Sequence, residues 1–338
     1  MQYANYHHQD RFNNSSFDEI DKHHTYNPTF TNRLLRQEFL NRGIELNNPD
    51  VNIGKDVAFN LYHDGQNTEI DLDRPNYLIA TENPFICCAN TDRNYLAKFN
   101  QVFTWNSNLL NLPNVTKIFI PNQIRRENFS SFPERSIFTC IINANKGFPY
   151  QIAGDLYKER INVIRWYEQN FPESFSLFGL GWEKPEPAFT LKQKIFRRFK
   201  RLATQLFSYR PFPSYSGEIV NKSEIYSQAK FAYCYENVEN LPDYISEKIF
   251  DSFFSGCVPI YWGANTIRNH IPKDCFIDRR DFKNMEELHK FLLEITPEKY
   301  AEYQSNIQRF LSSKEILKFD TSFYVKTIVD KICGDIQI

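Results

Sequence analysis

The sequence lacks several features that would assign a protein to a class directly. Its seven cysteines are odd in number and form no C-x-x-C pair, so we expect neither a disulfide framework nor a zinc site. It has no run of about 18 apolar residues, so we expect no membrane-spanning helix. Its formal net charge is −1, so no overall field favours nucleic acid or a membrane as partner.

Two signals that often identify a protein are also missing. The sequence contains no glycine-rich phosphate loop of the Walker or G-x-G-x-x-G kind. The first ten residues, MQYANYHHQD, do not combine a basic stretch with an apolar one, so we expect no secretory signal. Several cysteines lie in apolar runs, which is typical of free thiols in a reducing compartment. These features predict a cytoplasmic protein.

The length of 338 residues and the hydrophobic content of 41% are enough for two domains with separate cores. The polar, turn-rich stretch 122–136 is the expected boundary. We therefore expect one domain at 1–130 and a second at 131–313. A tail at 314–338 follows, which in one interpretation packs back on the first domain.

Short apolar runs alternate with helical patterns in both domains. In the first we expect a strand at 1–6, a helix at 31–45 that ends near Gly43, and strands at 57–62, 76–80, 101–106 and 116–121. In the second we expect strands at 137–145, 174–182, 230–237 and 258–263, and helices at 156–170, 223–229, 246–254, 286–295 and 297–313. This alternation predicts an α/β fold with parallel sheets.

The stretch DYISEKIF (243–250) follows a predicted strand and opens a predicted helix. Ligands of parallel sheets bind at the carboxyl ends of strands, and helix N-termini favour anions. Lys248 would add a positive charge to that helix start, and Asn237 could donate an amide hydrogen. Tyr244 could stack on a flat ligand or hydrogen-bond to it. The pattern indicates a site for a diphosphate.

Glu247 needs a separate explanation, because a carboxylate repels phosphate. It suits a sugar nucleotide, whose anomeric carbon becomes cationic as its bond to phosphate breaks. The alternative is structural: acidic residues in the first turn of a helix are favoured by the helix dipole alone.

Residues 231–282 resemble the hallmark segment of the α1,3/4-fucosyltransferases, glycosyltransferase family 10, in its bacterial branch. The shared elements occur in the family order: an aromatic residue before Glu-Asn, Tyr-x-Ser-Glu-Lys, Val-Pro-Ile-x-x-Gly, Pro-x-x-x-Phe-Ile and Asp-Phe. The resemblance implies a GT-B architecture, in which two Rossmann-like domains with parallel sheets face a cleft. It also implies GDP-fucose as donor substrate, inversion at the anomeric carbon and no required metal or cofactor.

The resemblance also implies roles for individual residues. The diphosphate would be held by Asn237, Tyr244 and Lys248, and Glu247 would lie beside the fucose. Arg160 would clamp the phosphates, since a guanidinium fork suits two phosphate oxygens; alternatively it lies on the solvated face of its helix. Tyr215, Gly217 and Lys222 would line the nucleotide pocket.

An inverting transferase needs a base on the acceptor side. The family supplies a glutamate at a strand end, and Glu82 occupies such a position in NYLIATENPF (76–85). The alternative is that Thr81–Pro84 is only a polar turn. His7 and His8 are expected in a loop at the acceptor edge, and Asp71-Leu72-Asp73 is interpreted as a chance match to a metal motif.

The insert at 191–212 contains many cations and no acid. Its apolar residues recur at helical spacing: Ile195, Phe196, Phe199, Leu202, Ala203, Leu206 and Phe207. Such a helix can lie on an anionic membrane, or it can pack on its own domain. Nucleic-acid binding has little support in a chain of this net charge.

The sequence as a whole predicts an inverting fucosyltransferase that moves L-fucose from GDP-fucose to a glycan hydroxyl. We expect an α1,3 linkage to a surface glycan such as lipopolysaccharide or capsule. We expect a cytoplasmic enzyme, and its association with the inner face of the cytoplasmic membrane depends on which interpretation of 191–212 holds. Two alternatives stay open. One is a transferase of the same fold with another nucleotide sugar, and the other is a non-catalytic protein that binds a sugar nucleotide or a glycan.

Overall fold

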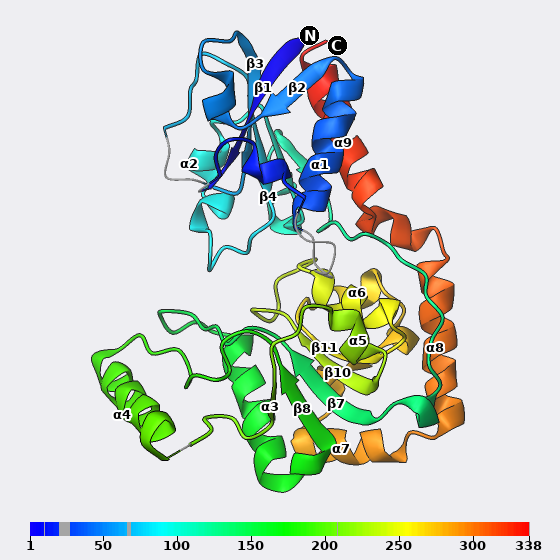
Figure 1. Ribbon diagram of the computed structural model, residues 1–338. Helices are drawn as coiled ribbons and strands as arrows, with labels where there is room; N and C mark the ends of the chain where they lie inside the picture. The colour runs from blue at the N-terminus through cyan, green and yellow to red at the C-terminus, as the bar shows by residue number, and fades with distance from the viewer. Residues whose placement is uncertain (10, 20–27, 66–68, 208, 338) are drawn as a thin grey trace. The chain divides into compact units, whose positions relative to one another are not determined.

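The computed structural model describes residues 1–9, 11–19, 28–65, 69–207 and 209–337, without the side chains of 28 and 203–207. The apolar positions Ala203, Leu206 and Phe207 of the expected insert helix therefore lie outside the description. The chain divides into two compact units. Unit 1 comprises Met1–Ile124, Pro242–Tyr244 and Lys314–Ile338, and unit 2 comprises Arg125–Leu241 and Ile245–Ser313 (Figure 1).

Unit 1 is built on a parallel sheet with the strand order β2-β1-β3-β4-β5-β6 in its described part. The strands are β1 Gln2–His8, β2 Ile44–Asn47, β3 Val57–His63, β4 Asn76–Ala80, β5 Gln101–Thr104 and β6 Val115–Lys117. The helices are α1 Pro28–Asn41, α2 Arg93–Leu96 and α9 Thr321–Asp335. Strand β4 is buried at every position, as expected for the middle of a parallel sheet covered on both faces.

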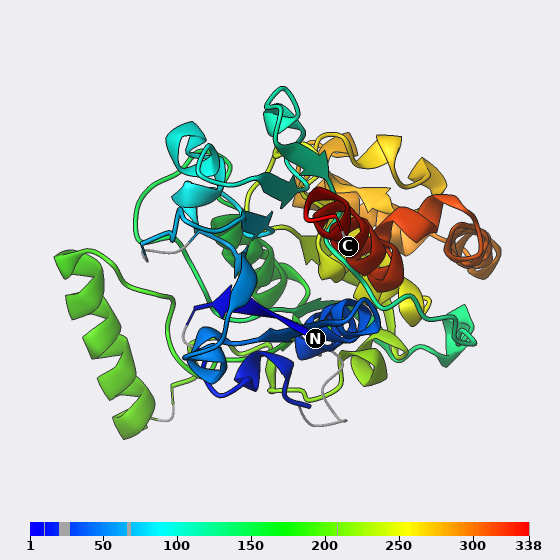
Figure 2. The same cartoon turned by 90° about the horizontal axis from the view of Figure 1, so that it is seen from above.

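Helices α1 and α9 lie side by side although they are far apart in the sequence (Figures 1 and 2). Asp320 caps α9 by accepting a hydrogen bond from the backbone N–H of Ser322. Tyr324, Ile328 and Ile332 follow at four-residue intervals and are buried in the core of unit 1. The end of the chain is therefore part of the core of unit 1.

Unit 2 is built on a second parallel sheet, with the strand order β12-β11-β10-β7-β8-β9 in its described part. The strands are β7 Ile137–Ile142, β8 Phe175–Phe178, β9 Tyr215–Gly217, β10 Ala229–Tyr235, β11 Val258–Trp262 and β12 Ile277–Asp278. The helices are α3 Leu156–Asn170, α4 Leu191–Phe207, α5 Lys222–Tyr226, α6 Glu247–Phe254, α7 Met285–Glu294 and α8 Pro297–Leu311. All seven cysteines of the chain are free.

The expected α/β class with parallel sheets is confirmed, and the expected helix at 156–170 has the bounds of α3. The expected strand at 116–121 is wrong beyond Lys117, because its partner β5 ends at Thr104 and leaves nothing to pair with. The expected loop position of His7 and His8 is also wrong. Both belong to β1, where they pair with β3.

Each sheet has one point at which the strand order reverses, and ligands of parallel sheets bind at the carboxyl ends of strands beside such a point. In unit 1 the reversal lies between β1 and β3, where His8 pairs with His63. In unit 2 it lies between β7 and β10, which end just before Asn143 and Glu236. The topology thus singles out one edge position in each unit.

The described helices include none whose length and apolar content would let it cross a membrane. Helix α4 is amphipathic, but its sequence carries too many cations for a membrane-spanning helix.

Candidate functional site

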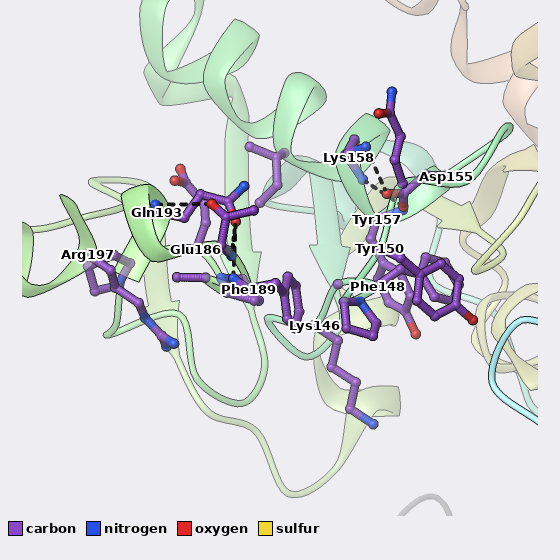
Figure 3. A pocket seen from close by; sticks show the side chains of 18 of the residues that line it. Lys146, Phe148, Tyr150, Asp155, Tyr157, Lys158, Glu186, Phe189, Gln193 and Arg197 are labelled. Carbon is purple, nitrogen blue, oxygen red and sulfur yellow. Dashed lines mark hydrogen bonds and ion pairs between the residues drawn. The ribbon is translucent and has the colours of Figure 1, made fainter. Parts of the chain in front are cut away.

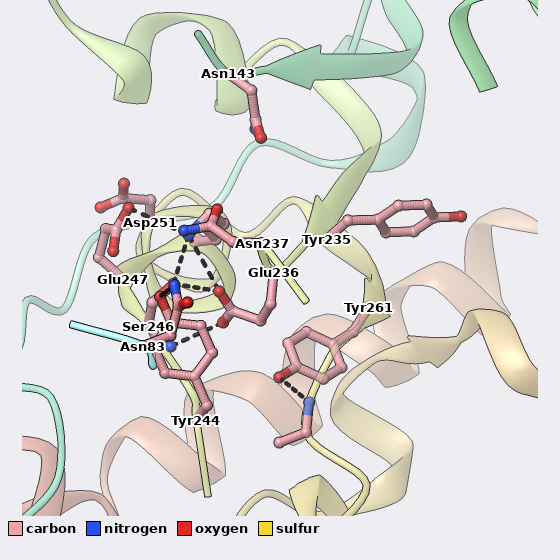
Figure 4. Close-up of polar contacts among 12 residues, drawn as sticks. Asn83, Asn143, Tyr235, Glu236, Asn237, Tyr244, Ser246, Glu247, Asp251 and Tyr261 are labelled. Carbon is pink, nitrogen blue, oxygen red and sulfur yellow. Dashed lines mark hydrogen bonds and ion pairs between the residues drawn. The ribbon is translucent and has the colours of Figure 1, made fainter. Parts of the chain in front are cut away.

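The site in unit 2 is built around Glu236, which follows the buried strand β10 and is itself fully buried. Its carboxylate accepts hydrogen bonds from the backbone N–H of Ser246 at 2.8 Å and from the Ser246 hydroxyl at 2.7 Å (Figure 4). It also accepts one from Nζ of Lys248 at 3.1 Å. Glu236 therefore fixes the first turn of α6 to the end of β10.

Neighbouring charged groups keep Lys248 and Glu247 in their charged forms. Burial would lower the pKa of Lys248, but the carboxylates of Glu236 and Glu247 raise it above its ordinary value. Burial would raise the pKa of Glu247, but Lys248 and Lys222 lower it to about 2. Nζ of Lys248 lies 3.8 Å from the nearer carboxylate oxygen of Glu247. Both side chains are charged at neutral pH.

A second ion pair lies next to the first. Lys222 is the first residue of α5, and its Nζ lies 2.7 Å from a carboxylate oxygen of Asp251 on α6. Burial raises the pKa of Asp251, and Lys222 acts against this. The pKa of Lys222 is raised overall, since Asp251 and Glu247 outweigh the effect of burial. This pair connects α5 and α6. It also places Lys222 close enough to Glu247 to lower the pKa of that carboxyl.

Arg160 lies on α3, whose start is capped by the side chain of Asp155. Its Nη2 donates to the backbone carbonyls of Tyr235 at 2.7 Å and Glu236 at 2.8 Å. The same nitrogen donates to Oδ1 of Asn237 at 3.1 Å. Only 4% of Arg160 is exposed, so in this structure the guanidinium is a buried support for the end of β10.

Three further strand ends meet at the same edge of the sheet. Gly179 follows β8 with a φ of +121°, and a Cβ at this position would lie 2.2 Å from the carbonyl oxygen of Asn143. Its N–H donates to the carbonyl of Gly217 at 3.1 Å, at the end of β9. Tyr215 begins β9 and packs partly buried against the core of unit 2. A side chain at residue 179 would therefore push apart the ends of β7 and β8.

The cations Arg160, Lys222 and Lys248 lie among the carboxylates Glu236, Glu247 and Asp251, so the formal charges of these six groups cancel. An anion that binds here gains Coulomb attraction from fixed cations, but it competes with carboxylates that already hold them. The arrangement suits a ligand with an anionic part beside a part that becomes positive, since Glu247 remains ionised.

In unit 1, Glu82 follows β4 at the carboxyl edge of the sheet. Its Oε1 accepts from the backbone N–H of Asn83 at 2.9 Å and from Nδ2 of Asn83 at 2.8 Å. Its own N–H donates to Oδ1 of Asp64 at 2.8 Å, which also accepts from the N–H of Thr81. These hydrogen bonds fix the end of β4 and the orientation of the Glu82 carboxylate.

Histidines occupy the neighbouring strand ends of unit 1. The rings of His8 and His63 are stacked with centroids 4.9 Å apart. Nδ1 of His63 contacts the hydroxyl of Tyr6 at 2.6 Å, and Nε2 contacts the hydroxyl of Thr81 at 3.2 Å. Burial and the adjacent His63 lower the pKa of His8 to about 4. His8 is therefore neutral near pH 7.

Tyr244, which the resemblance assigns to the diphosphate-binding residues, belongs to unit 1. Only 4% of the residue is exposed, and its ring lies 4.8 Å from that of Trp105. Its hydroxyl accepts from Nδ2 of Asn83 at 3.5 Å. The neighbouring Asp243 pairs with Lys117 of unit 1 at 2.6 Å.

Unit 2 also has a pocket of about 710 Å³ beside α3 (Figure 3). It is lined by the segment 146–151, by the start of α3, by the segment 185–190 and by one face of α4. Aromatic rings of Phe148, Tyr150 and Phe189 line it together with several charged side chains. The expected donor residues Asn237, Glu247 and Lys248 are not part of its lining.

Sequence reasoning assigned no role to Glu236 or Asp251, although both organise the site. A signal was present for Glu236, because an acid directly after the apolar run Phe231–Tyr235 must find partners at the strand end. Asp251 lies one turn after Glu247 on α6 and is buried in the same helix as Ile249, Phe250 and Phe253. Such an acid is also expected to pair with a cation.

Residues 204–336 match the family model described as "Glycosyltransferase family 10 (fucosyltransferase) C-term". The α-(1,3)-fucosyltransferase FucT of Helicobacter pylori is 41% identical over 69 residues, which are 20% of this chain and 14% of that protein. The human 4-galactosyl-N-acetylglucosaminide 3-α-L-fucosyltransferase 9 is 37% identical over 84 residues, which are 23% of each chain. The alignments thus span less than a quarter of each relative.

Solved structures resemble the whole chain at low sequence identity. An α1,3-fucosyltransferase has a TM-score of 0.54 at 13% identity, covering 100% of this chain and 90% of its own. An α-glucosyltransferase in complex with UDP and a 13-mer DNA has a TM-score of 0.56 at 12% identity, covering 98% and 99%. These matches show the fold alone, and at that level the expected GT-B architecture is confirmed.

The family match and the hallmark motif fall on the same part of the sequence. The match includes the whole of 231–282, the segment that contains the quoted family elements. Residues 204–336 are thus similar to glycosyltransferase family 10, the fucosyltransferase family, which is the family that the sequence resembles.

Proposed function

We propose that the chain is an inverting fucosyltransferase that moves L-fucose from GDP-fucose to a hydroxyl of a glycan. The observation that carries this proposal is the family match over the segment that contains Glu236, Glu247 and Lys248. The fucosyltransferases of Helicobacter pylori and human that match part of this chain support the choice of sugar.

In this proposal the diphosphate of GDP-fucose binds at the start of α6. Lys248 holds it together with Asn237, and Lys222 contributes a second positive charge near Glu247. Buried Arg160 donates a hydrogen bond from Nη2 to Oδ1 of Asn237, and so orients this side chain. Tyr215 and Gly217, the first and last residues of β9, lie toward the nucleoside. Tyr244 orders the loop that precedes α6.

The chemistry follows from two carboxylates with different tasks. The acceptor hydroxyl attacks the anomeric carbon as the bond from that carbon to the β-phosphate oxygen breaks, and GDP leaves as the anion. Glu82 takes the proton of the attacking hydroxyl. Glu247 remains ionised, because the pKa of its carboxyl is lowered to about 2, and stabilises positive charge on the sugar.

The acceptor in this proposal is a surface glycan such as lipopolysaccharide or capsule. The enzyme attaches fucose to it in an α1,3 linkage while the glycan is still linked to lipid. The glycan lies at the carboxyl edge of the unit 1 sheet, near Glu82 and the stacked pair His8 and His63. Such edges beside a reversal of strand order are where α/β sheets bind ligands. A lipid-linked acceptor implies work at the inner face of the cytoplasmic membrane.

The proposal is tested by following release of free sugar from GDP-fucose, GDP-mannose and UDP-glucose without acceptor. Glycosyltransferases commonly transfer some donor sugar to water. We expect release from GDP-fucose alone and its loss in Glu247→Gln, whereas Glu302→Gln on the exposed face of α8 keeps it. Release from another donor would replace fucose in the proposal. Release by Glu247→Gln at the wild-type rate would contradict the role of this carboxylate.

A further inference from the structure

Helix α4 is specified by its own sequence. Thr190 and Gln193 form a reciprocal capping box, in which the Gln193 N–H donates to the Thr190 hydroxyl at 3.3 Å. In return Oε1 of Gln193 accepts from the Thr190 N–H at 3.0 Å and from the Phe189 N–H at 3.1 Å. The helix that follows contains no glycine or proline. Its start therefore does not depend on packing against the rest of unit 2.

One face of α4 is turned toward its own unit. Gln193, Phe196, Arg197 and Lys200 line the pocket described above, and they recur at the three- and four-residue spacing of one helix face (Figure 3). Nζ of Lys200 lies 3.5 Å from a carboxylate oxygen of Glu186. Figures 1 and 2 both show α4 standing away from the sheet of unit 2. The contacts of α4 are thus made by a largely polar face.

The apolar stripe of α4 lies on the opposite face. With 3.6 residues per turn, Leu191, Ile195, Phe199 and Leu202 line up on one side, turned away from the pocket-lining residues. Their exposed fractions are 75%, 51%, 66% and 44%. Amphipathic helices of globular proteins normally bury this stripe against the core. Here it is the outer surface of the helix, so it is expected to bind something else.

The charges around the stripe identify its partner. Lys192, Lys194, Arg198 and Arg201 flank it and are exposed. The sequence has no aspartate or glutamate between Glu186 and Glu218, whereas the whole chain has a formal net charge of −1. An apolar stripe with aromatic residues between cations suits the surface of an anionic bilayer. Nucleic acid would use the cations but would leave the stripe in water.

We propose that α4 is a membrane-binding helix, which inserts Leu191, Ile195, Phe199 and Leu202 into the interfacial layer of an anionic lipid bilayer. Its flanking cations contact the lipid phosphates. The pocket-lining face keeps the helix attached to unit 2, so that the bound unit stays at the membrane surface. This binding does not depend on which nucleotide sugar the protein uses, and its test does not involve sugar transfer.

The experiment is sedimentation of the full chain with vesicles of phosphatidylcholine, with or without about one third phosphatidylglycerol. We expect binding to the anionic vesicles, weak binding to the neutral ones, and release by salt of about 0.5 M. Each cation near such a surface contributes roughly five-fold, so Lys194→Gln, Arg198→Gln and Arg201→Gln together should weaken binding by about 100-fold. Ile195→Ser with Phe199→Ser should weaken it at unchanged charge.

Matched controls are Lys290→Gln and Leu293→Ser on α7, which change exposed residues of the same types. Circular dichroism verifies that each variant is folded. Wild-type binding by the stripe variant would overturn the proposal. So would binding of a short oligonucleotide in place of vesicles, or oligomers of the chain that the stripe variant abolishes, because each assigns the face to another partner.

Discussion

The two units share one plan but differ in what they place at the reversal of strand order. In unit 2 this edge carries cations held by buried acids, with Lys248 bound to Glu236. In unit 1 the edge carries the stacked imidazoles of His8 and His63, of which His8 is neutral near pH 7, and a hydrogen-bonded carboxylate at Glu82. In our proposal the same sheet topology binds an anion in one unit and supplies the base for proton transfer in the other.

This difference shows where the specificity of each edge is encoded. The strands before each edge are similarly apolar, and the residues directly after them decide its chemistry. After β10 the sequence continues with Glu236 and Asn237, and after β4 it continues with Thr81 and Glu82. Few side chains therefore separate a binding edge from a reactive one, and single substitutions can test the contrast.

The largest expected effect concerns Glu82. If unit 1 supplies the base, Glu82→Gln should lower transfer from GDP-fucose by about 10³-fold, because the amide cannot accept the acceptor proton. Donor affinity should stay unchanged. Asp73→Asn, an exposed acid of the same unit, serves as the control and should keep full activity. Normal turnover by the Glu82 variant would remove the proposed division of tasks between the units.

The second effect concerns the buried pair in unit 2. Lys248→Met should lower the free energy of unfolding by about 3 kcal/mol, because the carboxylate of Glu236 is left buried without its cation. Adding Glu236→Gln should restore part of this loss but not donor binding. Denaturant titration measures the effect.

Lys299→Met is the matched control, since Lys299 pairs with Glu302 at 2.5 Å on the exposed face of α8. This pair is solvated, so its loss should not be measurable. Equal stability of the Lys248 and Lys299 variants would show that the buried pair does not anchor the site.

The third effect concerns the close approach of β7 and β8. Gly179→Ala should lower the free energy of unfolding by about 1–3 kcal/mol, since its φ of +121° and the nearby Asn143 carbonyl exclude a side chain. Gly334→Ala on α9 meets no neighbour and should be neutral or slightly stabilising. Thermal unfolding of both variants compares a required glycine with a dispensable one. Equal changes in melting temperature would show that a side chain at residue 179 causes no strain.

The smallest effect is the response of each unit to acid. The pKa of His8 is lowered to about 4 from an ordinary 6.5, so its neutral form stabilises the fold. That contribution is present above pH 6.5 and is lost as the pH falls toward 4. The pKa of Glu247 is lowered to about 2 from 4.5, so its contribution is lost only between pH 4.5 and 2.

Unfolding measured from pH 7.5 to 3 should therefore separate the two groups. His8→Gln should flatten the slope of stability between pH 6.5 and 4, and Glu247→Gln should flatten it only below about pH 4.5. If both variants followed the wild-type slope throughout, the electrostatic contrast between the edges would be wrong.

The elements of unit 2 could be predicted because their local signals are strong. The apolar strand before Glu236 and the helix opened by Ser246 both follow from residue pattern, and α3 has a capping aspartate before its periodic residues. The hallmark motif indicated the family whose model matches residues 204–336. These features are local, so one sequence is enough to find them.

What could not be predicted depends on contacts between distant residues. The length of β6 is limited by where β5 ends, and His8 belongs to a strand because β3 pairs with it. Tyr244 packs on Trp105, which lies far away in the sequence. Glu236 was part of the quoted motif, but only the fold shows that it holds Ser246 and Lys248.

The central claim is that GDP-fucose binds at the start of α6, and calorimetry tests it most directly. GDP-fucose, GDP-mannose and UDP-galactose would be titrated into the wild type and Lys248→Ala. We predict selective binding of GDP-fucose by the wild type and its loss in the variant. Equal binding of GDP-fucose by both proteins would contradict the claim.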